Sequence, residues 1–446
     1  MASTTLPETE MFSRPVDSYW EASADPLELA TPPLATSERC EVAIIGGGVT
    51  GLSAALELAE RGLDVRLLEA GHIGWGASGR NGGFACIGSH KLSHDTMIRR
   101  YGLEATLAYH RAMRDSVALV ADTLARFGID AWASGAGEVT LAHHPGRVAE
   151  LRAEQETLRT TFGEETEFLP KEALTQNGLD GPGFFAGLKA QNGFGLHPLN
   201  YVRGLARAAA AAGAKLHAHS ALLRWEETAD GHHLHTRGST LTARHVIIAT
   251  NGYTPEQVSV RHAGRLLPAL SSIIVTRPLS PAEQAAQGWT SPLMAFDTRN
   301  LLHYFRLLPN GRFLFGGRGG TDASATGDAA YRPILTDAFH TLFPAWRDVE
   351  VTHYWRGNVC LARDRVPYVG ALDEKVSVWT AIAYHGNGVA MGSWCGRAVA
   401  RLAAGHTDRA HLPPVLTRRL ARFPLPVFRP LYLKGAYLWY GWQDGR

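Results

Sequence analysis

The chain has few of the features that mark several large classes of protein. Its 446 residues include only four cysteines and no C-x-x-C pair, so neither a disulfide scaffold nor a cysteine-based metal site is expected. No apolar run reaches the length of a membrane span, and no early segment has the form of a signal peptide. The net charge of +2 gives no electrostatic reason for binding nucleic acid. We therefore expect a cytoplasmic protein with no transmembrane segment, no nucleic-acid partner and no metal site.

The most informative segment follows a polar N-terminal stretch. An apolar strand leads into a Gly-x-Gly-x-x-Gly turn made by Gly46, Gly48 and Gly51, and a helical stretch follows. In such a unit the glycines permit a tight turn, close approach to a pyrophosphate and close packing, while the helix N-terminus stabilises the phosphates. A second apolar strand, 65–68, ends on Glu69, whose carboxylate can accept the hydroxyls of a ribose. The pattern predicts a dinucleotide site; the acid disfavours NADP and leaves FAD and NAD open.

The rest of the pattern divides the chain into separate pieces. Helical spacing runs from residue 96 to 126 and from 198 to 212, while residues 256–350 hold short alternating strands. A buried strand at 376–382 runs into a glycine-rich helix start. The chain is thus predicted to be an α/β protein, with a Rossmann-like dinucleotide-binding domain of discontinuous segments and a substrate domain with a mostly antiparallel sheet and helices. The predicted boundaries are 1–38 for an N-terminal extension, 39–90, 195–255 and 350–405 for the dinucleotide-binding domain, 91–194 and 256–349 for the substrate domain, and 406–446 for a C-terminal extension packed on the body.

Four motifs in order carry a resemblance to a known superfamily. They are the run Gly-Trp-Gly-Ala-Ser-Gly-Arg-Asn-Gly-Gly at 74–83, the strand 247–253, Trp355-x-Gly357 followed by Asp364-x-x-Pro367-x-x-Gly370, and the loop 386–389. With these motifs the chain resembles the FAD-dependent amine and amino-acid oxidases of the D-amino-acid oxidase, glycine oxidase and sarcosine oxidase type, over nearly its whole length. Within that superfamily the motifs are most similar to the γ-glutamylputrescine oxidoreductase subfamily. The resemblance implies FAD as the cofactor.

The sequence departs from the superfamily pattern at two places. The last motif usually reads Gly-His-Gly, whereas here it is His385-Gly386-Asn387-Gly388, so no substrate preference is carried over. Monomeric sarcosine oxidases tether FAD through a cysteine seven residues before the aspartate of the C-terminal motif. Gly357 holds that position, and Cys360 is out of register. We therefore expect FAD to be bound non-covalently.

The resemblance places FAD against the glycine turn, the loop 77–83 and the start of the last helix. Glycine backbone permits close approach, and Ser78 and Asn81 offer hydrogen bonds. Arg80 either neutralises a phosphate, reaches toward the flavin or pairs with a structural carboxylate. Backbone N–H groups and the helix dipole at 386–389 would stabilise negative charge on reduced flavin. The predicted cofactor-binding residues are Gly46, Gly48, Gly51, Glu69, Ala70, Ala77, Ser78, Arg80, Asn81, Gly82, Gly83, Leu222, Thr250, Asn251, Gly252, Gly386, Asn387, Gly388 and Val389.

Five residues are candidates for the substrate side of the site: Tyr253, His303, Arg306, Tyr384 and His385. Side chains alternate along a strand, so His303 and Arg306 lie on opposite faces, and only one face can look at the flavin. Arg306 either clamps a substrate carboxylate or is solvated, and His303 is either a base or a core histidine. Tyr253 either forms a wall of the site or packs in the core. Tyr384 and His385 are placed beside the flavin by their position in the last motif.

These expectations describe an FAD-dependent enzyme that oxidises the C–N bond of an amine or amino acid to an imine, which then hydrolyses. Its partners would be that small-molecule substrate and an electron acceptor, either molecular oxygen, giving hydrogen peroxide, or another acceptor. An FAD-dependent 2-hydroxy-acid dehydrogenase of the same fold and a non-catalytic dinucleotide-binding protein are the alternatives. A yellow protein whose colour bleaches with an amine would separate the enzyme from the latter.

Overall fold

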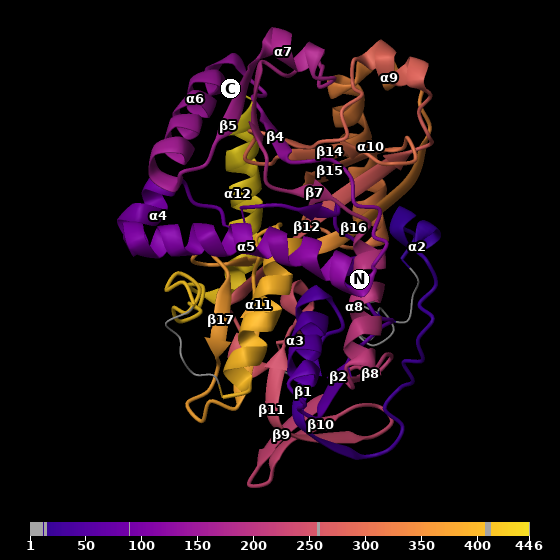
Figure 1. The fold of residues 1–446 in the computed structure, drawn as a ribbon, viewed down its shortest axis with the longest axis vertical. Coiled ribbons are helices and arrows are strands. Elements are labelled where there is room, and N and C mark those ends of the chain that lie inside the picture. The colour runs from indigo at the N-terminus through magenta and orange to yellow at the C-terminus, as the bar shows by residue number, and fades with distance from the viewer. Residues whose placement is uncertain (1–11, 13–15, 89, 257–258, 406–411, 446) are drawn as a thin grey trace.

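The computed structural model describes residues 12, 16–88, 90–256, 259–405 and 412–445, which form two eight-stranded sheets, one above the other in Figure 1. The first sheet has the order β17-β18-β11-β1-β2-β8, and the hairpin β10-β9 extends it beside β11. Strands β18, β11, β1, β2 and β8 run parallel, so their carboxyl ends share one edge, where open α/β sheets bind ligands. The strands of this sheet are β1 (Glu38–Ile45), β2 (Val65–Leu68), β8 (Lys215–His217), β9 (Arg224–Thr228), β10 (Gly231–His235), β11 (Thr240–Ile248), β17 (Tyr368–Ala371) and β18 (Val378–Ile382).

The register of the first sheet brings distant parts of the sequence together at that edge. Ile45 is level with Leu68 on one side and with Ile248 on the other. The residues that follow these strands therefore emerge side by side, and they include Gly46 and Glu69. The dinucleotide unit predicted from the sequence is present, with its strand, turn, helix and second strand in the expected order.

Helices cover one face of the first sheet and form the largest core of the protein. They are α3 (Val49–Glu60), α8 (Pro198–Ala211), α11 (Gly388–Ala403) and α5 (Leu103–Phe127). The sequence predicted one helix over 96–126, but the structure has α4 (His94–Tyr101) and α5, separated at Gly102, whose φ of +87° interrupts the helix. Helix α5 was assigned to the substrate domain; it packs instead against α11, with Met113 and Val117 in the same core. Figure 1 shows α5 running across the boundary between the two halves.

The second sheet has the order β16-β12-β15-β14-β13-β4-β6-β5 and is antiparallel except where β13 pairs with β4. A mostly antiparallel sheet in a second domain was predicted, and the fold class is confirmed. Strand β16 pairs in this sheet, although it falls in the segment 350–405 that was assigned to the dinucleotide-binding domain. The strands are β4 (Glu138–Leu141), β5 (Thr166–Pro170), β6 (Ala186–Ala190), β12 (Leu266–Thr276), β13 (Met294–Asp297), β14 (His303–Leu307), β15 (Phe313–Arg318) and β16 (Val351–Ala362).

The remaining elements are short apart from two helices. Most of the first 15 residues of the predicted N-terminal extension, and residues 406–411 of the C-terminal one, lie outside the described residues. No helix in the described part of the chain combines the length and apolar character needed to cross a membrane. Apart from short 3₁₀ turns, the remaining helices and strands are α2 (Tyr19–Ser23), α6 (Val148–Thr157) with a π-helical turn (Leu158–Phe162), α7 (Lys171–Gln176), α9 (Pro281–Gln287), α10 (Ala325–Leu342), α12 (Arg429–Asp444), β3 (Phe84–Ala85) and β7 (Phe194–Gly195).

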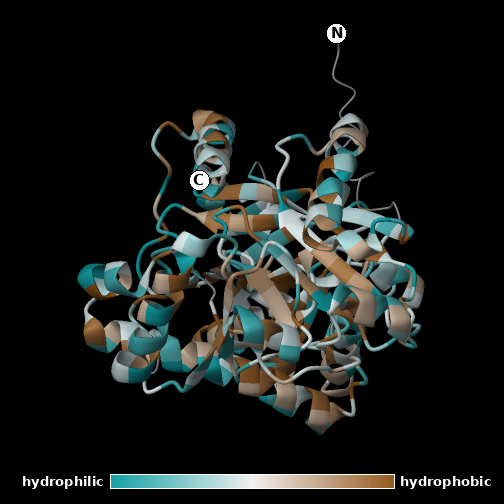
Figure 2. Cartoon of the chain, turned by 90° about the horizontal axis from the view of Figure 1, so that it is seen from above, coloured by the Kyte–Doolittle hydropathy of each residue, from teal (hydrophilic) through white to brown (hydrophobic). Residues whose placement is uncertain are grey.

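The last helix, α12, lies against the second sheet. Leu433 on its inner side is buried, and the Asp444 carboxylate accepts 2.8 Å hydrogen bonds from the backbone N–H groups of Asn300 and Leu301. Its outer side leaves Leu438 and Trp439 exposed. Figure 2 shows the helix beside the C-terminal label, standing out from the body with hydrophobic residues along it.

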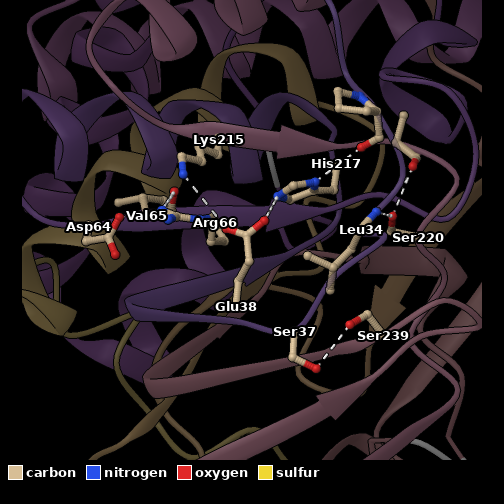
Figure 3. A network of polar contacts seen from close by, with 12 residues as sticks. Leu34, Ser37, Glu38, Asp64, Val65, Arg66, Lys215, His217, Ser220 and Ser239 are labelled. Carbon is tan, nitrogen blue, oxygen red and sulfur yellow. Dashed lines mark hydrogen bonds and ion pairs between the residues drawn. The ribbon is translucent and has the colours of Figure 1, made fainter.

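A polar network links strands β1, β2 and β8 of the first sheet (Figure 3). The carboxylate of Glu38 on β1 accepts a 2.6 Å hydrogen bond from Arg66 on β2 and lies 3.7 Å from the imidazole of His217 on β8. The hydrogen bond from Arg66 is the main reason why the pKa of Glu38 is lowered. In the same region Ser220 donates its N–H to the carbonyl of Glu69 at 2.7 Å and accepts from the N–H of Leu34 at 2.9 Å. The network therefore fixes the segment after β8 beside the carboxyl end of β2.

Candidate cofactor and substrate site

A cavity of about 450 Å³ begins at the carboxyl edge of the first sheet and continues to the second sheet. One end is lined by the glycine turn, Glu69, Ala70 and Leu222. The other end is lined by residues 384–389 together with Phe296, Leu302, Tyr304 and Arg318. The loop 76–82 and residues Thr250, Asn251 and Tyr253 line the stretch between them.

The glycine turn leaves no room for side chains. Gly46 has φ +111°, and a Cβ added there would lie 2.8 Å from the carbonyl oxygen of Ala249. A Cβ on Gly51 would lie 1.9 Å from the carbonyl oxygen of Gly46, so this glycine permits helix α3 to pack on the turn. Gly51 does not line the cavity itself. Gly46 and Gly48 do, and they provide the close approach that a pyrophosphate requires.

Glu69 braces the turn as well as lining the cavity. Its Oε2 accepts a 2.6 Å hydrogen bond from the N–H of Gly47, and its Oε1 accepts a 2.9 Å bond from the N–H of Gly71. Burial raises the pKa of the Glu69 carboxyl, and these two hydrogen bonds act in the opposite direction. The sequence predicted only a contact with ribose; the bracing role depends on how the loop after β2 folds back.

The loop 77–83 uses most of its polar side chains on itself and on α3. Ser78 accepts a 2.9 Å hydrogen bond from the N–H of Val49, the first residue of α3. The Asn81 amide donates to the carbonyls of Ala77 and Ser78, and its Oδ1 accepts from the N–H of Gly83 at 2.8 Å. Asn81 and Ser78 therefore hold the loop in the shape that lines the cavity.

Arg80 is the charged group of this loop. Its guanidinium lies 4.0 Å from the centre of the Trp75 ring, and its Nε donates to the Trp75 carbonyl at 2.7 Å. Burial lowers the pKa of Arg80. No carboxylate within the described ranges pairs with it, and its buried Nη2 has no partner there. The structural ion pair that was one alternative for Arg80 is therefore absent among the described residues. An unpaired cation beside the cavity suits the phosphates of a dinucleotide.

The segment before α11 forms a tight loop at the far end of the cavity. His385 has φ +55°, and Gly386 has φ +114°. A Cβ on Gly386 would lie 2.8 Å from Nη2 of Arg318, which donates to the His385 carbonyl at 2.7 Å. Asn387 donates to the carbonyl of Ile87 at 2.6 Å. Helix α11 then begins at Gly388, so its unpaired N–H groups and dipole face the cavity.

Three of the five substrate-side candidates line the cavity: Tyr253, Tyr384 and His385. The Tyr384 hydroxyl lies 2.8 Å from the hydroxyl of Thr50, and burial raises its pKa. Tyr253 accepts a 3.1 Å hydrogen bond from the N–H of Asn358, so its hydroxyl is fixed while its ring forms a wall. His385 is 1% exposed, makes no well-formed ring hydrogen bond with a described residue, and has its pKa lowered by burial to about 3. Its imidazole is therefore neutral.

The other two candidates lie outside the cavity lining: His303 takes the core alternative, and Arg306 takes neither of the two roles predicted for it. His303 lies 3.0 Å from the buried carboxylate of Asp297 and stacks on Phe315, so it belongs to the core of the second domain. Arg306 is 1% exposed and donates to the carbonyls of Gly82 at 3.1 Å and Leu196 at 2.6 Å. Burial lowers its pKa to about 9. It fastens two backbone segments and is not available as a carboxylate clamp.

Two further glycines of the predicted set also serve packing and do not line the cavity. A Cβ on Gly83 would lie 2.0 Å from the carbonyl oxygen of Leu196, and one on Gly252 would lie 3.1 Å from Cβ of Asn358. Both residues let neighbouring backbone come close to the site.

Among the residues that line the cavity but were not predicted as site residues are Tyr304, Arg318 and Lys91. Tyr304 could have been found from the alternation of β14, since it lies on the face opposite His303. Its ring lies over Gly316, where a Cβ would be 2.3 Å from Cζ. The two glycines that precede Arg318 on β15 were a weak indication that it is a site residue. No pattern in the sequence indicated Lys91.

The residues of the cavity fit FAD. The glycine cradle and Glu69 suit an adenosine diphosphate, the unpaired Arg80 suits its phosphates, and the start of α11 suits an electron-accepting ring. The FAD dependent oxidoreductase family, DAO, matches residues 41–402. The chain therefore belongs to the DAO family of FAD-dependent oxidoreductases, and FAD is its cofactor.

Similar proteins agree with this assignment. The chain is 30% identical to the gamma-glutamylputrescine oxidoreductase of Escherichia coli (strain K12), over 93% of this chain and 96% of that protein. It is 26% identical to the glycine oxidase of Geobacillus kaustophilus, over 86% of this chain and 99% of that protein. The crystal structure of glycine oxidase from Geobacillus kaustophilus superposes with a TM-score of 0.69 at 24% identity, covering 86% of this chain and 100% of that one. The resemblance drawn from the motifs is confirmed.

Proposed function

We propose that this enzyme oxidises the C–N bond of an amine or amino acid to an imine, with molecular oxygen as the acceptor. Bound FAD supplies the redox chemistry, because it can take a hydride equivalent and pass the electrons on. The similar proteins named above act on substrates of this kind by their names, which supports the substrate class.

One observation carries the proposal. Among the described residues that line the cavity, Glu69 is the only acid, and it lies at the adenosine end. The far end contains the cations Lys91 and Arg318, without a carboxylate that would pair with an ammonium. Because nearby positive charge and low polarity both disfavour a charged ammonium, an amine would bind there in its neutral form. Its lone pair is then free to assist departure of the hydride.

The chain's own residues would position and desolvate the substrate. The rings of Tyr253 and Tyr304 wall the cavity, and the neutral His385 adds no charge. The N–H groups at Gly388 and the guanidinium of Arg318 would favour negative charge on the bound cofactor. No dedicated base is required if the amine is already neutral.

A 2-hydroxy acid is a weaker candidate because its oxidation needs a base. An alcohol must lose its hydroxyl proton, and this requires a base. His385, with a pKa of about 3, is a poor one, and the Tyr384 hydroxyl is held by Thr50. Cytoplasmic location is part of the proposal, and the four free cysteines support it.

The test is anaerobic bleaching of the yellow holoenzyme with matched pairs of amines and hydroxy acids on the same carbon skeletons. We expect amines or amino acids to bleach the colour and hydroxy acids to leave it. Air should restore the colour with release of hydrogen peroxide. Bleaching by hydroxy acids alone would refute the substrate class, and a colour that air does not restore would refute oxygen as the acceptor.

A further inference from the structure

We propose that the C-terminal segment of the chain binds the surface of a membrane that contains anionic phospholipid. The segment covers residues 412–445 and includes helix α12. The proposed contact is peripheral, with the segment lying on the bilayer surface. The inference goes beyond the proposed function, because it concerns a surface outside the cavity and does not depend on which substrate the enzyme oxidises.

The first observation is a concentration of exposed apolar side chains. More than half of the large hydrophobic side chains that are exposed in the described residues lie between 425 and 442, and the others are scattered over the rest of the chain. Scattered apolar residues are normal on a surface, whereas a contiguous patch marks a site of contact. Val427 and Leu438 are each 79% exposed. We call the following exposed side chains the apolar ridge: Leu425, Val427, Phe428, Leu431, Leu438 and Trp439.

The spacing along α12 places the helical part of the apolar ridge on one outward side. Leu438 and Trp439 follow Leu431 after about two turns of helix, so the three share a side. The opposite side carries the buried Leu433 and Asp444, which is hydrogen-bonded to the second domain. The helix therefore presents one side to the body of the protein and an apolar side to the outside (Figure 2).

The second observation is a cluster of cations without acids, formed by Arg265, Arg419 and Arg422. Burial and then the charges of Arg419 and Arg422 lower the pKa of Arg265, so the three guanidinium groups lie close enough to repel one another. None of them forms an ion pair with an acid of the described residues. The Arg265 guanidinium donates instead to the backbone carbonyls of Arg261 and Leu420. An anionic surface would relieve the repulsion within this arginine cluster.

The arginine cluster lies beside the apolar ridge. A Cβ built on Gly264 would lie 2.7 Å from Cγ of Pro426 and 2.9 Å from Nε of Arg422. Pro426 stands between Leu425 and Val427, so the guanidinium of Arg422 lies next to exposed apolar side chains. This combination is typical of proteins that bind at a lipid–water interface, where apolar side chains enter the acyl boundary and cations contact the headgroups.

The charges favour an anionic bilayer over a second copy of the chain. In an isologous dimer the same face meets itself, so the arginine cluster would need acids on that face. The one acid among the described residues 412–445 is Asp444, which already accepts hydrogen bonds from the second domain. Two other acids near the segment also have cations beside them: Glu256 forms an ion pair with Arg429, and Asp322 lies near the charge of Lys434. Anionic headgroups supply the negative charge that this face lacks.

The test is co-sedimentation of the full-length, FAD-loaded enzyme with two kinds of lipid vesicle. One kind contains phosphatidylcholine with phosphatidylglycerol, and the other contains phosphatidylcholine alone. We expect the enzyme to sediment with the anionic vesicles and to bind the neutral ones about tenfold less tightly or weaker still. Binding to the anionic vesicles should fall as the salt concentration is raised, because salt screens the attraction between the arginines and the headgroups.

A first variant removes apolar surface from the ridge. Leu438→Ser should weaken binding to the anionic vesicles about tenfold, because a leucine that leaves water on binding is lost. The matched control is Leu223→Ser, at an exposed position beside β9, which Figure 1 shows away from α12. This control should bind the vesicles like the parent enzyme.

A second variant removes charge from the cluster. Arg419→Gln combined with Arg422→Gln should weaken binding about twentyfold, since each cation near an anionic surface contributes about fivefold. The matched control combines Arg237→Gln with Arg244→Gln, which removes two exposed arginines from the first sheet and changes the net charge equally. It should bind like the parent enzyme.

Each outcome decides the proposal. Equal binding to both kinds of vesicle, no sedimentation with the anionic vesicles, or unchanged binding after Leu438→Ser or after the paired arginine substitutions would overturn it. A parent enzyme that ignores the vesicles but forms a dimer in gel filtration, which Leu438→Ser dissociates, would assign the ridge to a second copy. The substituted positions are exposed, and thermal unfolding without vesicles checks that each variant is folded. Flavin bleaching without vesicles tests the proposed function separately, so failure of either can be told from failure of the other.

Discussion

The indole N–H of Trp355 donates a 2.8 Å hydrogen bond to the carbonyl oxygen of Arg80. Trp355 lies on β16 of the second sheet, and Arg80 lies in the loop that lines the cofactor cavity. The next carbonyl, that of Asn81, accepts a 2.8 Å bond from the indole N–H of Trp20. Two indoles from distant parts of the chain thus hold adjacent peptide groups of one loop, so the position of the loop depends on the packing of the two halves.

Trp355→Phe should loosen this loop. The phenyl ring keeps most of the packing, while the N–H is lost and the Arg80 carbonyl is left without its partner. We expect a loss of about 1 kcal/mol in the free energy of unfolding and faster release of FAD. Denaturant unfolding and the rate of flavin release measure the two effects. The exposed Trp439→Phe is the control, and equal release rates in both variants would contradict the assigned role.

FAD should be released intact by acid or heat denaturation. Gly357 stands where a tethering cysteine is found in monomeric sarcosine oxidases. Cys360 does line the cavity, but burial raises the pKa of its thiol to about 12, so the reactive thiolate is not formed at neutral pH. The check is the partition of flavin after acid precipitation. Yellow colour that remains in the washed precipitate would be evidence for a covalent bond.

Glu69→Gln should weaken FAD binding. A glutamine has one acceptor oxygen, so it cannot serve both the Gly47 and Gly71 N–H groups, and its NH₂ would face one of these donors. Losing a hydrogen bond to a charged group costs about 1.5–3 kcal/mol, which corresponds to at least tenfold in affinity. The reconstituted apoprotein is titrated with FAD, and Glu28→Gln, at an exposed position, is the control. Full flavin occupancy after purification and unchanged affinity would remove Glu69 from the site.

Arg306→Met should destabilise the fold without a specific effect on substrate binding. It leaves the carbonyls of Gly82 and Leu196 without the guanidinium, at a cost of about 3 kcal/mol for two charge-assisted bonds. We expect a lower unfolding temperature and an unchanged KM in the folded fraction. A large rise in KM at unchanged stability would restore Arg306 as a substrate clamp.

The lowered pKa of Lys91 also determines how the free energy of unfolding changes with pH. The pKa is about 7 in the folded chain against the ordinary 10.5, so the unfolded chain binds more protons between these values. The contribution of Lys91 to the free energy of unfolding therefore rises with pH across that window.

The cofactor half of the site could be predicted from the sequence because its determinants are local. A strand, a turn and a helix within some 30 residues place Gly46, Gly48 and Glu69 together wherever the unit occurs. The start of α11 was recognisable for the same reason, as a strand running directly into a glycine-rich helix start. Alternation along β14 likewise separated His303 from Tyr304, although it could not say which face meets the flavin.

What the sequence alone determined was thus the dinucleotide unit, the family and the cofactor. The tertiary structure decided which charged side chains reach the cavity, because that depends on contacts between segments far apart in the chain. Arg306 donates hydrogen bonds to two backbone carbonyls from other segments. Lys91 and Arg318, in contrast, form no ion pair with an acid of the described residues. The partners of a charged side chain are fixed only when the chain is folded. No local sequence pattern could therefore have shown which of these cations has partners and which has none.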